Sequence, residues 1–314
     1  MSQDLTAPND ANPQRRFLGV GITGEVVQSG ERALKMPRQY DTKNVTQARR
    51  RELEWLMEVS CRKIKTEMQV YEHLGHHEGI IAASYQLPMH DDEEHYNPVI
   101  SMPYMKNGTL QEYLSKKEPD EKLQITWIRS LAAAVAFCHD RNVILADIGS
   151  RNCLLADDFS LRLCDFGEST IIPPHLDVAA VNDNGASVKT DIAQFGSVVY
   201  EISTRINLCD PKQPRIDFVE DEIKITNDDD ESGSDGGDEG PDGYSEGDVI
   251  ADQTECGGKS PKWPRTEDLP RTEGIRFGSI IFKCWTRAYQ HMNQVLRDLD
   301  DYEQVRSVRA WKAA

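Results

Sequence analysis

The chain has 314 residues, which is enough for two average domains or for one large domain divided into two lobes. Hydrophobic residues make up 38% of it, but no apolar run approaches the roughly 18 residues of a membrane-spanning helix, so we expect no membrane association. The polar segment 1–16 does not resemble a secretory signal. Seven scattered cysteines without a Cys-x-x-Cys pair indicate neither a disulfide framework nor a zinc module, and we expect a cytoplasmic or nuclear protein.

The net charge of −17 is concentrated in one part of the chain. Segment 217–248 holds 14 acidic residues and a single basic one, so it carries −13 of this charge and leaves −4 for the rest. The remaining chain is therefore almost balanced. It contains no basic block of the kind that binds nucleic acid, and we expect no nucleic-acid partner.

The first 38 residues combine a polar tail with a predicted β-hairpin. Segment 1–14 is polar, contains Asn and Pro, and is predicted to be disordered. Segment 15–38 consists of short β-like runs that are broken by glycines, with a turn at Ser29-Gly30. Two such runs around a Ser-Gly turn are typical of a hairpin.

A Gly-x-Gly-x-x-Gly string formed by Gly19, Gly21 and Gly24 lies in this hairpin. Three interpretations compete: a dinucleotide-binding turn, a hairpin that covers phosphates, and a glycine-rich turn without a ligand. The dinucleotide fold requires a helix directly after the last glycine. Here Gly24 leads into the β-like run 25–27, which favours a hairpin whose glycines let the backbone approach phosphates.

Apolar periodicity predicts a mostly helical remainder. Apolar residues at spacings of three, four and seven predict a helix over 45–74, which Gly75 ends. We expect strands over 80–87 and 98–102, then helices over 109–117, 121–139, 191–204, 278–285 and 291–299. The helix over 121–139 is apolar on more than one face, so we expect it to be buried. A strand-rich first third and a helical remainder predict an α+β protein of two lobes.

Segment 217–260 is rich in Asp, Glu, Gly and Ser and has few apolar side chains. Such a stretch cannot bury enough surface to offset its ordering entropy, so it is predicted to be a disordered insert. Three roles remain open for it: a plain linker, a surface for basic partners, and a site where an acid-directed kinase modifies Ser232 or Ser245.

Four polar side chains at the ends of apolar runs are candidates for chemistry. Lys35 ends the run after the glycine string and can reach phosphates beneath it as a point charge. Asp147 and Asn152 lie five residues apart in a loop between two apolar runs, where both can face one cleft. Asp165 follows a predicted strand and precedes Phe-Gly, a position that suits a Mg²⁺ ligand. Each of these residues alone is equally compatible with an ordinary strand end or turn.

The order of these motifs is more informative than any one of them. A glycine loop, a lysine, a helix with an acid, Asp-x4-Asn and Asp-Phe-Gly resemble the eukaryotic protein kinase family over about residues 15–300. The segments VISMPYMKNGTL, KTDIAQFGSVVYEI and KCW resemble the interlobe hinge, the central helix of the large lobe with its buried Asp191, and a late helix of that family. The Asp-Ile-Gly-x-x-Asn loop is similar to that of divergent kinase-like proteins of filamentous fungi.

The resemblance implies a division into lobes and a role for each motif residue. It implies a small lobe over 15–102, a large lobe that begins with the hinge at 103 and runs to 216, the insert over 217–260, and terminal helices over 261–314. ATP and Mg²⁺ would be the cofactors and a protein the substrate of an expected monomer. Asp147 would accept the proton of the substrate hydroxyl, and Asn152 and Asp165 would hold Mg²⁺.

The same resemblance assigns a nucleotide site and its partners. Lys35 would hold the α- and β-phosphates and pair with Glu67, with Glu54 and Glu58 less well placed, and Tyr71 would pack one turn beyond. The backbones of Pro103 and Met105 would bond adenine, with Met102 as gatekeeper. The implied nucleotide-binding residues are Gly19, Gly21, Gly24, Val26, Ala33, Lys35, Glu67, Met102, Pro103, Met105 and Leu154.

The sequence departs from the family pattern at several points. Leu145-Ala146 replaces the usual His-Arg before the catalytic Asp: a leucine can fill the packing role of the histidine, but an alanine cannot replace an arginine that clamps a phosphorylated loop. Gly149 replaces a lysine, and Arg151 offers a compensating cation, as in the catalytic loop of tyrosine kinases. No Ala-Pro-Glu precedes the central helix, and Arg287 is the candidate for its missing arginine partner.

Four functions therefore stay open. The first is a protein kinase that acts on Ser or Thr, with Tyr as the other acceptor, and the surviving Lys35, Asp147, Asn152 and Asp165 favour it. The second is a pseudokinase that binds a nucleotide or serves as a scaffold, which the altered loop favours. A dinucleotide-binding enzyme and a small-molecule kinase of the same fold are the remaining two.

Overall fold

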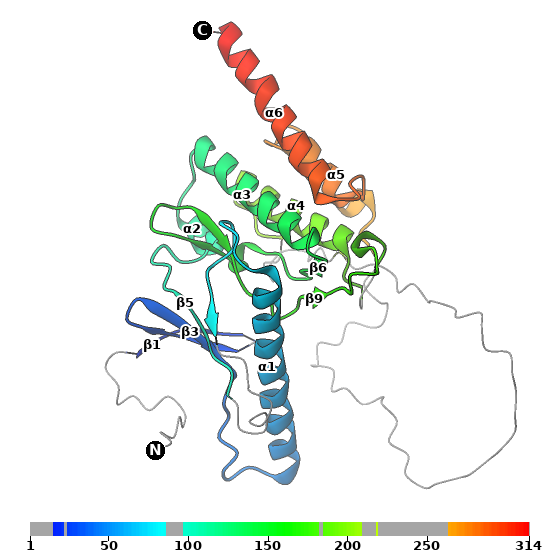
Figure 1. The fold of residues 1–314 in the computed structure, drawn as a ribbon. Helices are drawn as coiled ribbons and strands as arrows, with labels where there is room; N and C mark the ends of the chain where they lie inside the picture. Colours follow the sequence, from blue (N-terminus) through cyan, green and yellow to red (C-terminus); the bar gives the residue numbers. More distant parts are fainter. Residues whose placement is uncertain are drawn as a thin grey trace, which may run out of the picture.

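The structure of the chain is a computed structural model that describes residues 15–21, 24–85, 97–181, 185–208, 218 and 263–313, with side chains as far as Gln304. It has a β-rich N-terminal part and a helical C-terminal part, as expected for an α+β protein of two lobes (Figure 1). None of the helices in the described ranges is both long and apolar enough to cross a membrane.

The N-terminal lobe is built on an antiparallel sheet of five strands. Its strands are β1 (Arg15–Val20), β2 (Glu25–Ser29), β3 (Arg32–Met36), β4 (Ser84–Tyr85) and β5 (Ile100–Pro103), in the order β1-β2-β3-β5-β4. The turn between β2 and β3 lies at Gly30-Glu31, one residue later than predicted, and Gly30 has a left-handed φ of 59° that glycine adopts without steric cost. Side chains of β3 alternate between half-buried and buried, so every second residue faces the lobe interior.

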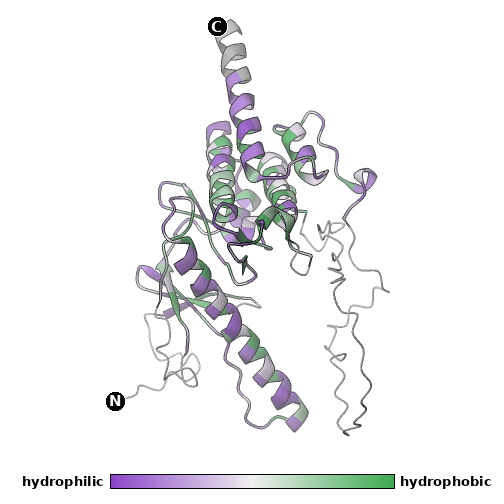
Figure 2. Cartoon of the chain, turned by 45° about the vertical axis from the view of Figure 1, so that its right-hand side comes forward, coloured by the Kyte–Doolittle hydropathy of each residue, from purple (hydrophilic) through white to green (hydrophobic). Residues whose placement is uncertain are grey.

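One long helix, α1 (Gln47–Leu74), packs against this sheet. Thr46 caps its start by accepting a hydrogen bond from the Arg49 amide at 3.3 Å, and Gly75 ends it with a φ of 67°. The helix confirms the prediction over 45–74 to within two residues. The N-terminal part of α1 extends beyond the strands in Figure 1 and is mostly hydrophilic in Figure 2, whereas most of its buried side chains lie in the C-terminal half.

The C-terminal lobe consists of helices around two short antiparallel pairs of strands. The helices are α2 (Leu110–Lys116), α3 (Glu121–His139), α4 (Val188–Thr204), α5 (Gly278–Trp285) and α6 (Met292–Ala313). The strands β6 (Val143–Ile144) and β9 (Thr170–Ile171) form one antiparallel pair, and β7 (Cys153–Leu155) and β8 (Leu161–Leu163) form another. Single 3-10 turns are η1 (Ser150–Asn152), η2 (Val178–Ala180) and η3 (Thr266–Asp268).

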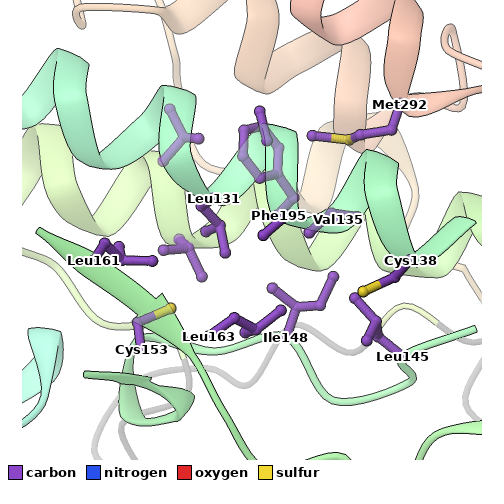
Figure 3. Packing of buried hydrophobic residues seen from close by; sticks show 14 of the residues in the cluster. Leu131, Val135, Cys138, Leu145, Ile148, Cys153, Leu161, Leu163, Phe195 and Met292 are labelled. Carbon is purple, nitrogen blue, oxygen red and sulfur yellow. The ribbon is translucent and has the colours of Figure 1, made fainter. Parts of the chain in front are cut away.

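The core of this lobe surrounds α3, as its apolar faces predict. Trp127, Ile128 and Leu131 have no exposed surface, and burying each such side chain contributes about 1.5–3 kcal/mol to folding. Figure 3 shows side chains of α3, α4, α6 and the β7–β8 pair in one apolar cluster. Leu145 and Ile148 enter the same core from the loop after β6, with 4% and 6% of their surface exposed. This packing anchors the loop that carries Asp147 on both of its sides.

Several element boundaries differ from the predicted ones. Helix α4 begins at Val188, before Asp191, because Ser187 and Thr190 form a capping box with reciprocal hydrogen bonds. Helix α6 continues to Ala313, beyond the last buried leucine at 299, where the apolar pattern no longer marks a helix. In the region predicted as a strand over 80–87, the strand comprises only Ser84–Tyr85, and residues 86 and 87 lie outside the described ones.

Phe218 is the one described residue within the predicted insert 217–260. It is not solvated as that prediction implies, because only 6% of it is exposed. Its ring lies 5.3 Å from the ring of Trp263 and 6.4 Å from that of Trp285. Phe218 and Trp263, the described residues that flank segment 219–262, therefore lie in the same aromatic cluster, and the 44 residues between them are outside the described ones.

Candidate active site

A cleft of about 1140 Å³ lies between the two lobes. Its walls include residues of β1, β2 and β3 on one side and of α2, η1 and β7 on the other. All of the predicted site residues line this one cleft: Gly19, Gly21, Gly24, Val26, Ala33, Lys35, Glu67, Met102, Pro103, Met105, Asp147, Arg151, Asn152, Leu154 and Asp165. The structure thus brings together side chains that are up to 146 residues apart in sequence.

The glycine string begins at Gly19 in β1 and continues through Gly21 and Gly24 into the connection between β1 and β2. The Gly21 amide donates to the Gly24 carbonyl at 2.8 Å, and residues 22 and 23 lie outside the described ones. A Cβ atom at Gly24 would lie 2.6 Å from the Met36 carbonyl oxygen, so this position has no room for a larger residue. Strand β2, and not a helix, follows Gly24, and this contradicts the dinucleotide-binding interpretation.

Lys35 lies on β3, opposite Val26 on one side and Ile100 on the other. Its Nζ atom is 2.6 Å from Oε2 of Glu67 and 2.6 Å from Oδ1 of Asp165. Only 4% of Lys35 and none of Glu67 is exposed, so the lysine sits between two carboxylates in a nearly dry environment. Neither Glu54 nor Glu58 makes this contact; Glu58 pairs with Arg62 on the exposed side of α1.

Burial and charge act in opposite directions on the pKa values of this cluster. Burial disfavours the charged form of Lys35, but the carboxylates of Glu67 and Asp165 outweigh it and raise the pKa of the lysine above its usual range. Burial also raises the pKa of Glu67, against the lowering effect of Lys35. The ammonium group is therefore held as a fixed positive charge inside the cleft.

Two further contacts hold α1 against the Asp-Phe-Gly segment. The ring of Tyr71, one turn after Glu67, meets the ring of Phe166 edge-on at a centroid distance of 5.0 Å. Lys63, one turn before Glu67, has its Nζ atom 2.5 Å from Oε2 of Glu168. Contacts on both sides of Glu67 thus fix the helix in the position where it reaches Lys35.

Asp147 follows β6 in the loop that ends with the 3-10 turn η1. Arg151, four residues later, contacts Oδ1 of Asp147, and Asn152 donates from Nδ2 to its Oδ2 and to its backbone carbonyl, both at 2.9 Å. The Asp147 side chain is 32% exposed and lines the cleft. Both carboxylate oxygens are therefore oriented by neighbours while the group stays accessible from the cleft.

Helix α4 holds the backbone of this loop through two side chains. Asp191 is fully buried; it accepts from the amides of Leu145 and Ala146, each at 2.8 Å, and lies 2.9 Å from Nε2 of His139. Gln194, one turn further along, bonds to the backbone of Ala146 and Ile148. Sequence reasoning missed Gln194; its only signal is a polar residue on the same face of an apolar helix as Asp191.

The hinge connects the lobes at the end of β5. Met102, the predicted gatekeeper, is 6% exposed and lines the cleft. The Tyr104 amide donates to the Glu31 carbonyl at 2.9 Å, and the Met105 carbonyl accepts from Gly108 at 3.1 Å. The Pro103 carbonyl and the Met105 amide flank Tyr104 along the cleft wall, which suits the edge of an adenine ring.

The residues at the phosphate end of the cleft also fit a hard cation. Asn152 uses its Nδ2 atom for Asp147, which leaves its carbonyl oxygen as the atom that can bind a metal. Asp165 contributes a carboxylate with 29% of its side chain exposed. Oxygen ligands of this kind are those that Mg²⁺ prefers, and it usually completes its shell with water and substrate phosphates. No cluster of three or more His, Cys, Asp or Glu side chains for a metal occurs among the described residues.

Arg287, the predicted partner of the missing acidic residue, contacts an aromatic ring. The guanidinium of Arg287 lies 4.0 Å from the centre of the Trp263 ring, a cation–π contact at the base of segment 219–262. Residues 182–184, where the Ala-Pro-Glu motif is missing, lie outside the described ones. Arg287 therefore helps to close the aromatic cluster around Phe218 and Trp263.

Comparison with known proteins identifies the fold around this cleft. Residues 13–230 match the family described as "Protein kinase domain". The tyrosine-protein kinase receptor TYRO3 of Mus musculus is 28% identical over 130 residues, which cover 34% of this chain and 15% of that protein. The transforming protein RYK of avian retrovirus RPL30, also a tyrosine-protein kinase, is 24% identical over 229 residues, which cover 65% of this chain and 50% of that protein.

A plant relative extends the comparison beyond proteins named as tyrosine kinases. Wall-associated receptor kinase-like 14 of Arabidopsis thaliana is 30% identical over 145 residues, which cover 40% of this chain and 20% of that protein. The chain thus spans at most half the length of these relatives. Because the match to the family covers more than half of the chain and includes every site motif from the glycine string to Gln194, the chain belongs to the protein kinase family.

Proposed function

We propose that the chain is an active protein kinase that transfers the γ-phosphoryl group of Mg-ATP to a side-chain hydroxyl of a protein. The contact of Lys35 with both Glu67 and Asp165 carries this proposal, because it joins the phosphate-binding lysine, the helix that positions it and the metal-binding aspartate in one buried cluster. Phosphoryl transfer demands positioning and charge neutralisation more than covalent chemistry from the protein. This cluster supplies both.

Each wall of the cleft would bind one part of ATP. The Pro103 carbonyl and the Met105 amide would bond the adenine edge, with Ala33 and Leu154 covering the two faces of the ring. The glycines of the β1–β2 connection would allow its backbone to approach the phosphates. Lys35 would bind the α- and β-phosphates with the charge that its carboxylate neighbours maintain.

Asn152 and Asp165 would hold Mg²⁺, which when bound neutralises charge on the phosphate oxygens. Asp147 would accept a hydrogen bond from the substrate hydroxyl and take its proton as the oxygen attacks the γ-phosphorus, while the bond from that phosphorus to the β-phosphate oxygen breaks and ADP leaves. Arg151 and Asn152 each contact one oxygen of Asp147, so the carboxylate is oriented before the substrate arrives. No substrate-binding energy is then needed to order the base.

Two observations favour tyrosine as the first acceptor to examine. The cation next to Asp147 comes from Arg151, four residues later, and not from a lysine two residues later, where Gly149 stands. Two of the three relatives, TYRO3 and RYK, are named tyrosine-protein kinases. Serine and threonine are the acceptors proposed next.

The altered residue before Asp147 favours a second candidate, a pseudokinase that binds nucleotide without transferring phosphate. Ala146 has no side chain that can bind a phosphorylated loop. However, Leu145 is buried as the packing role requires, and α4 holds the loop backbone by hydrogen bonds. These contacts support catalysis over scaffolding.

An acceptor survey with a nucleotide-binding assay separates the two candidates. Peptide pools that contain only Tyr, or only Ser and Thr, as hydroxyl residues are incubated with ATP labelled at the γ-position and Mg²⁺, and the unfolding temperature is measured with and without ATP. We expect transfer to at least one pool and stabilisation by ATP. Stabilisation without transfer would establish the pseudokinase instead, and the absence of both would refute nucleotide binding.

A further inference from the structure

Gln194 binds the backbone on both sides of Asp147, whereas Asn152 binds only the Asp147 carbonyl and Asp191 binds only amides that precede Asp147. Its Oε1 atom accepts from the Ile148 amide at 2.8 Å, and its Nε2 atom donates to the Ala146 carbonyl at 2.9 Å. These two backbone groups stand immediately after and immediately before Asp147. One side-chain amide therefore bridges the two peptide groups that join Asp147 to the chain.

This bridge restrains the backbone conformation of Asp147. A residue has only two soft dihedral angles, because its peptide groups are planar. The Ala146 carbonyl moves with φ of Asp147, and the Ile148 amide moves with ψ. Rotation about either bond must break one of the two hydrogen bonds to Gln194. These hydrogen bonds therefore restrain the backbone conformation of Asp147, from which its side chain projects.

The neighbouring Asp191 cannot perform this task. It accepts from the amides of Leu145 and Ala146, both of which precede Asp147, and it lies too early in the loop to restrain the peptide group after Asp147. Asp191 and Gln194 are three residues apart on α4, so they lie on the same face of that helix. Together they satisfy four backbone groups of the loop, and only Gln194 reaches beyond Asp147.

The backbone before Asp147 needs such support. Ala146 has a φ of 64°, in the left-handed region that disfavours every residue with a Cβ atom. Its methyl group cannot make the polar contacts of a long side chain. The amide of Ala146 is bound to Asp191 and its carbonyl to Gln194, so both polar groups of the strained residue are held by α4.

We propose that Gln194 is a positioning residue for the catalytic base Asp147, a role that rests on the proposed kinase activity. Gln194 does not touch the substrate; it does not line the cleft. It acts by fixing the two peptide groups on either side of the base.

The test compares two substitutions of Gln194 with a matched control. Gln194→Met keeps the length of the side chain and removes both hydrogen bonds, and Gln194→Glu keeps the acceptor but offers a donor only when it is protonated. The control is Gln294→Met, because Oε1 of Gln294 also accepts from two amides, those of Gln290 and His291, and Gln294 does not line the cleft. The readouts are kcat, KM for ATP, unfolding temperature and hydrogen exchange of the Ile148 amide.

We expect Gln194→Met to lower kcat by about 10- to 100-fold, since small misplacements of a reacting group have effects of this size. KM for ATP should change by less than about twofold, because Gln194 does not line the nucleotide cleft. A decrease in kcat without a change in KM would show that Asp147 is misplaced relative to the reacting hydroxyl. The kcat of Gln194→Glu relative to that of the wild type should rise as the pH falls, because the protonated carboxyl again donates to the Ala146 carbonyl. The Ile148 amide should exchange faster in Gln194→Met but not in Gln294→Met.

Several outcomes would overturn the proposal. One is a Gln194→Met protein with the kcat of the wild type, and another is a loss no greater than that of Gln294→Met. Unchanged exchange of the Ile148 amide would show that Gln194 does not fix the loop. If the wild-type chain transfers no phosphate, the proposed function fails, and exchange at Ile148 still decides whether Gln194 holds the backbone. If Gln194→Met does not fold, Gln194→Glu with its pH dependence provides the same decision.

Discussion

The buried pair of Lys35 and Glu67 makes a quantitative prediction about stability. Their side chains are 6% and 0% exposed, and removal of one member of such a pair leaves an uncompensated buried charge that costs about 3–5 kcal/mol. Lys35→Met removes the cation next to Glu67, so we expect a loss in this range. Glu67→Met should cost less, because Asp165 remains 2.6 Å from the lysine.

The double substitution tests the reasoning. With both charges removed and two apolar side chains in their place, the loss of free energy of unfolding should fall below about 2 kcal/mol, because replacing a whole buried pair is often neutral. The double variant should therefore be more stable than Lys35→Met alone. At about 2–4 °C per kcal/mol, Lys35→Met should lower the unfolding temperature by about 6–20 °C.

Urea unfolding of the three variants beside the wild type, without nucleotide, measures this cycle. Lys43→Met is the control, since Lys43 is exposed and its loss should have little effect. In Lys35→Met, the pKa of Glu67 stays high, because its carboxyl is buried without a cation. The unfolded state, in which the pKa of Glu67 is about 4.3, then releases this proton more readily than the folded state does. The loss of stability should therefore grow as the pH rises above about 4.3. Additive losses in the double variant would refute the reasoning.

Further predictions concern packing and acid stability. Gly278→Ala should lower the free energy of unfolding by at least about 1–3 kcal/mol, because its Cβ atom would overlap the Thr272 carbonyl oxygen. At Gly274 a Cβ atom would have no neighbour within 4 Å, so Gly274→Ala should cost only the strain of its φ of 77°. Thermal unfolding of both variants measures the two losses. Burial opposes ionisation of Asp298, but Lys283 outweighs it and lowers the pKa of the carboxyl. The ionised Asp298 therefore contributes to stability above about pH 4, and this contribution is lost at lower pH. The difference in free energy of unfolding between the wild type and Asp298→Asn should vanish as the pH falls. Equal differences at about pH 7 and about pH 2 would contradict this.

The residues that sequence patterns identify in this chain lie in short segments. Lys35 ends an apolar run, Asp147 and Asn152 share one loop, and Asp165 follows a short strand, so local spacing is enough to suggest a role for each. Their positions in one cleft follow from the order of these segments along a known type of fold. The pairing of Glu67 with Lys35 follows in the same way. However, the position of α1 relative to the sheet cannot be predicted from the residues of the helix alone.

Gln194 and Phe218 show why other features escape such patterns. The hydrogen bonds of Gln194 join residues 46 and 48 positions apart, and they depend on the helix face and loop path that only the packed structure defines. Phe218 stands in an acidic, glycine-rich segment, where composition predicts solvent exposure, and it is buried because Trp263 and Trp285 form a site for it. Both features arise from partners that are distant in sequence.

Phosphoryl transfer by the wild-type chain and by Asp147→Asn tests the central claim most directly. Asp157→Asn, an exposed aspartate in the β7–β8 turn, is the control with the same change of charge. The claim predicts transfer of the γ-phosphoryl group of ATP by the wild type and by Asp157→Asn, and a rate at least about 100-fold lower for Asp147→Asn, which is the contribution of a general base. Equal rates for Asp147→Asn and the wild type, or a wild type that is stabilised by ATP and transfers nothing, would contradict it.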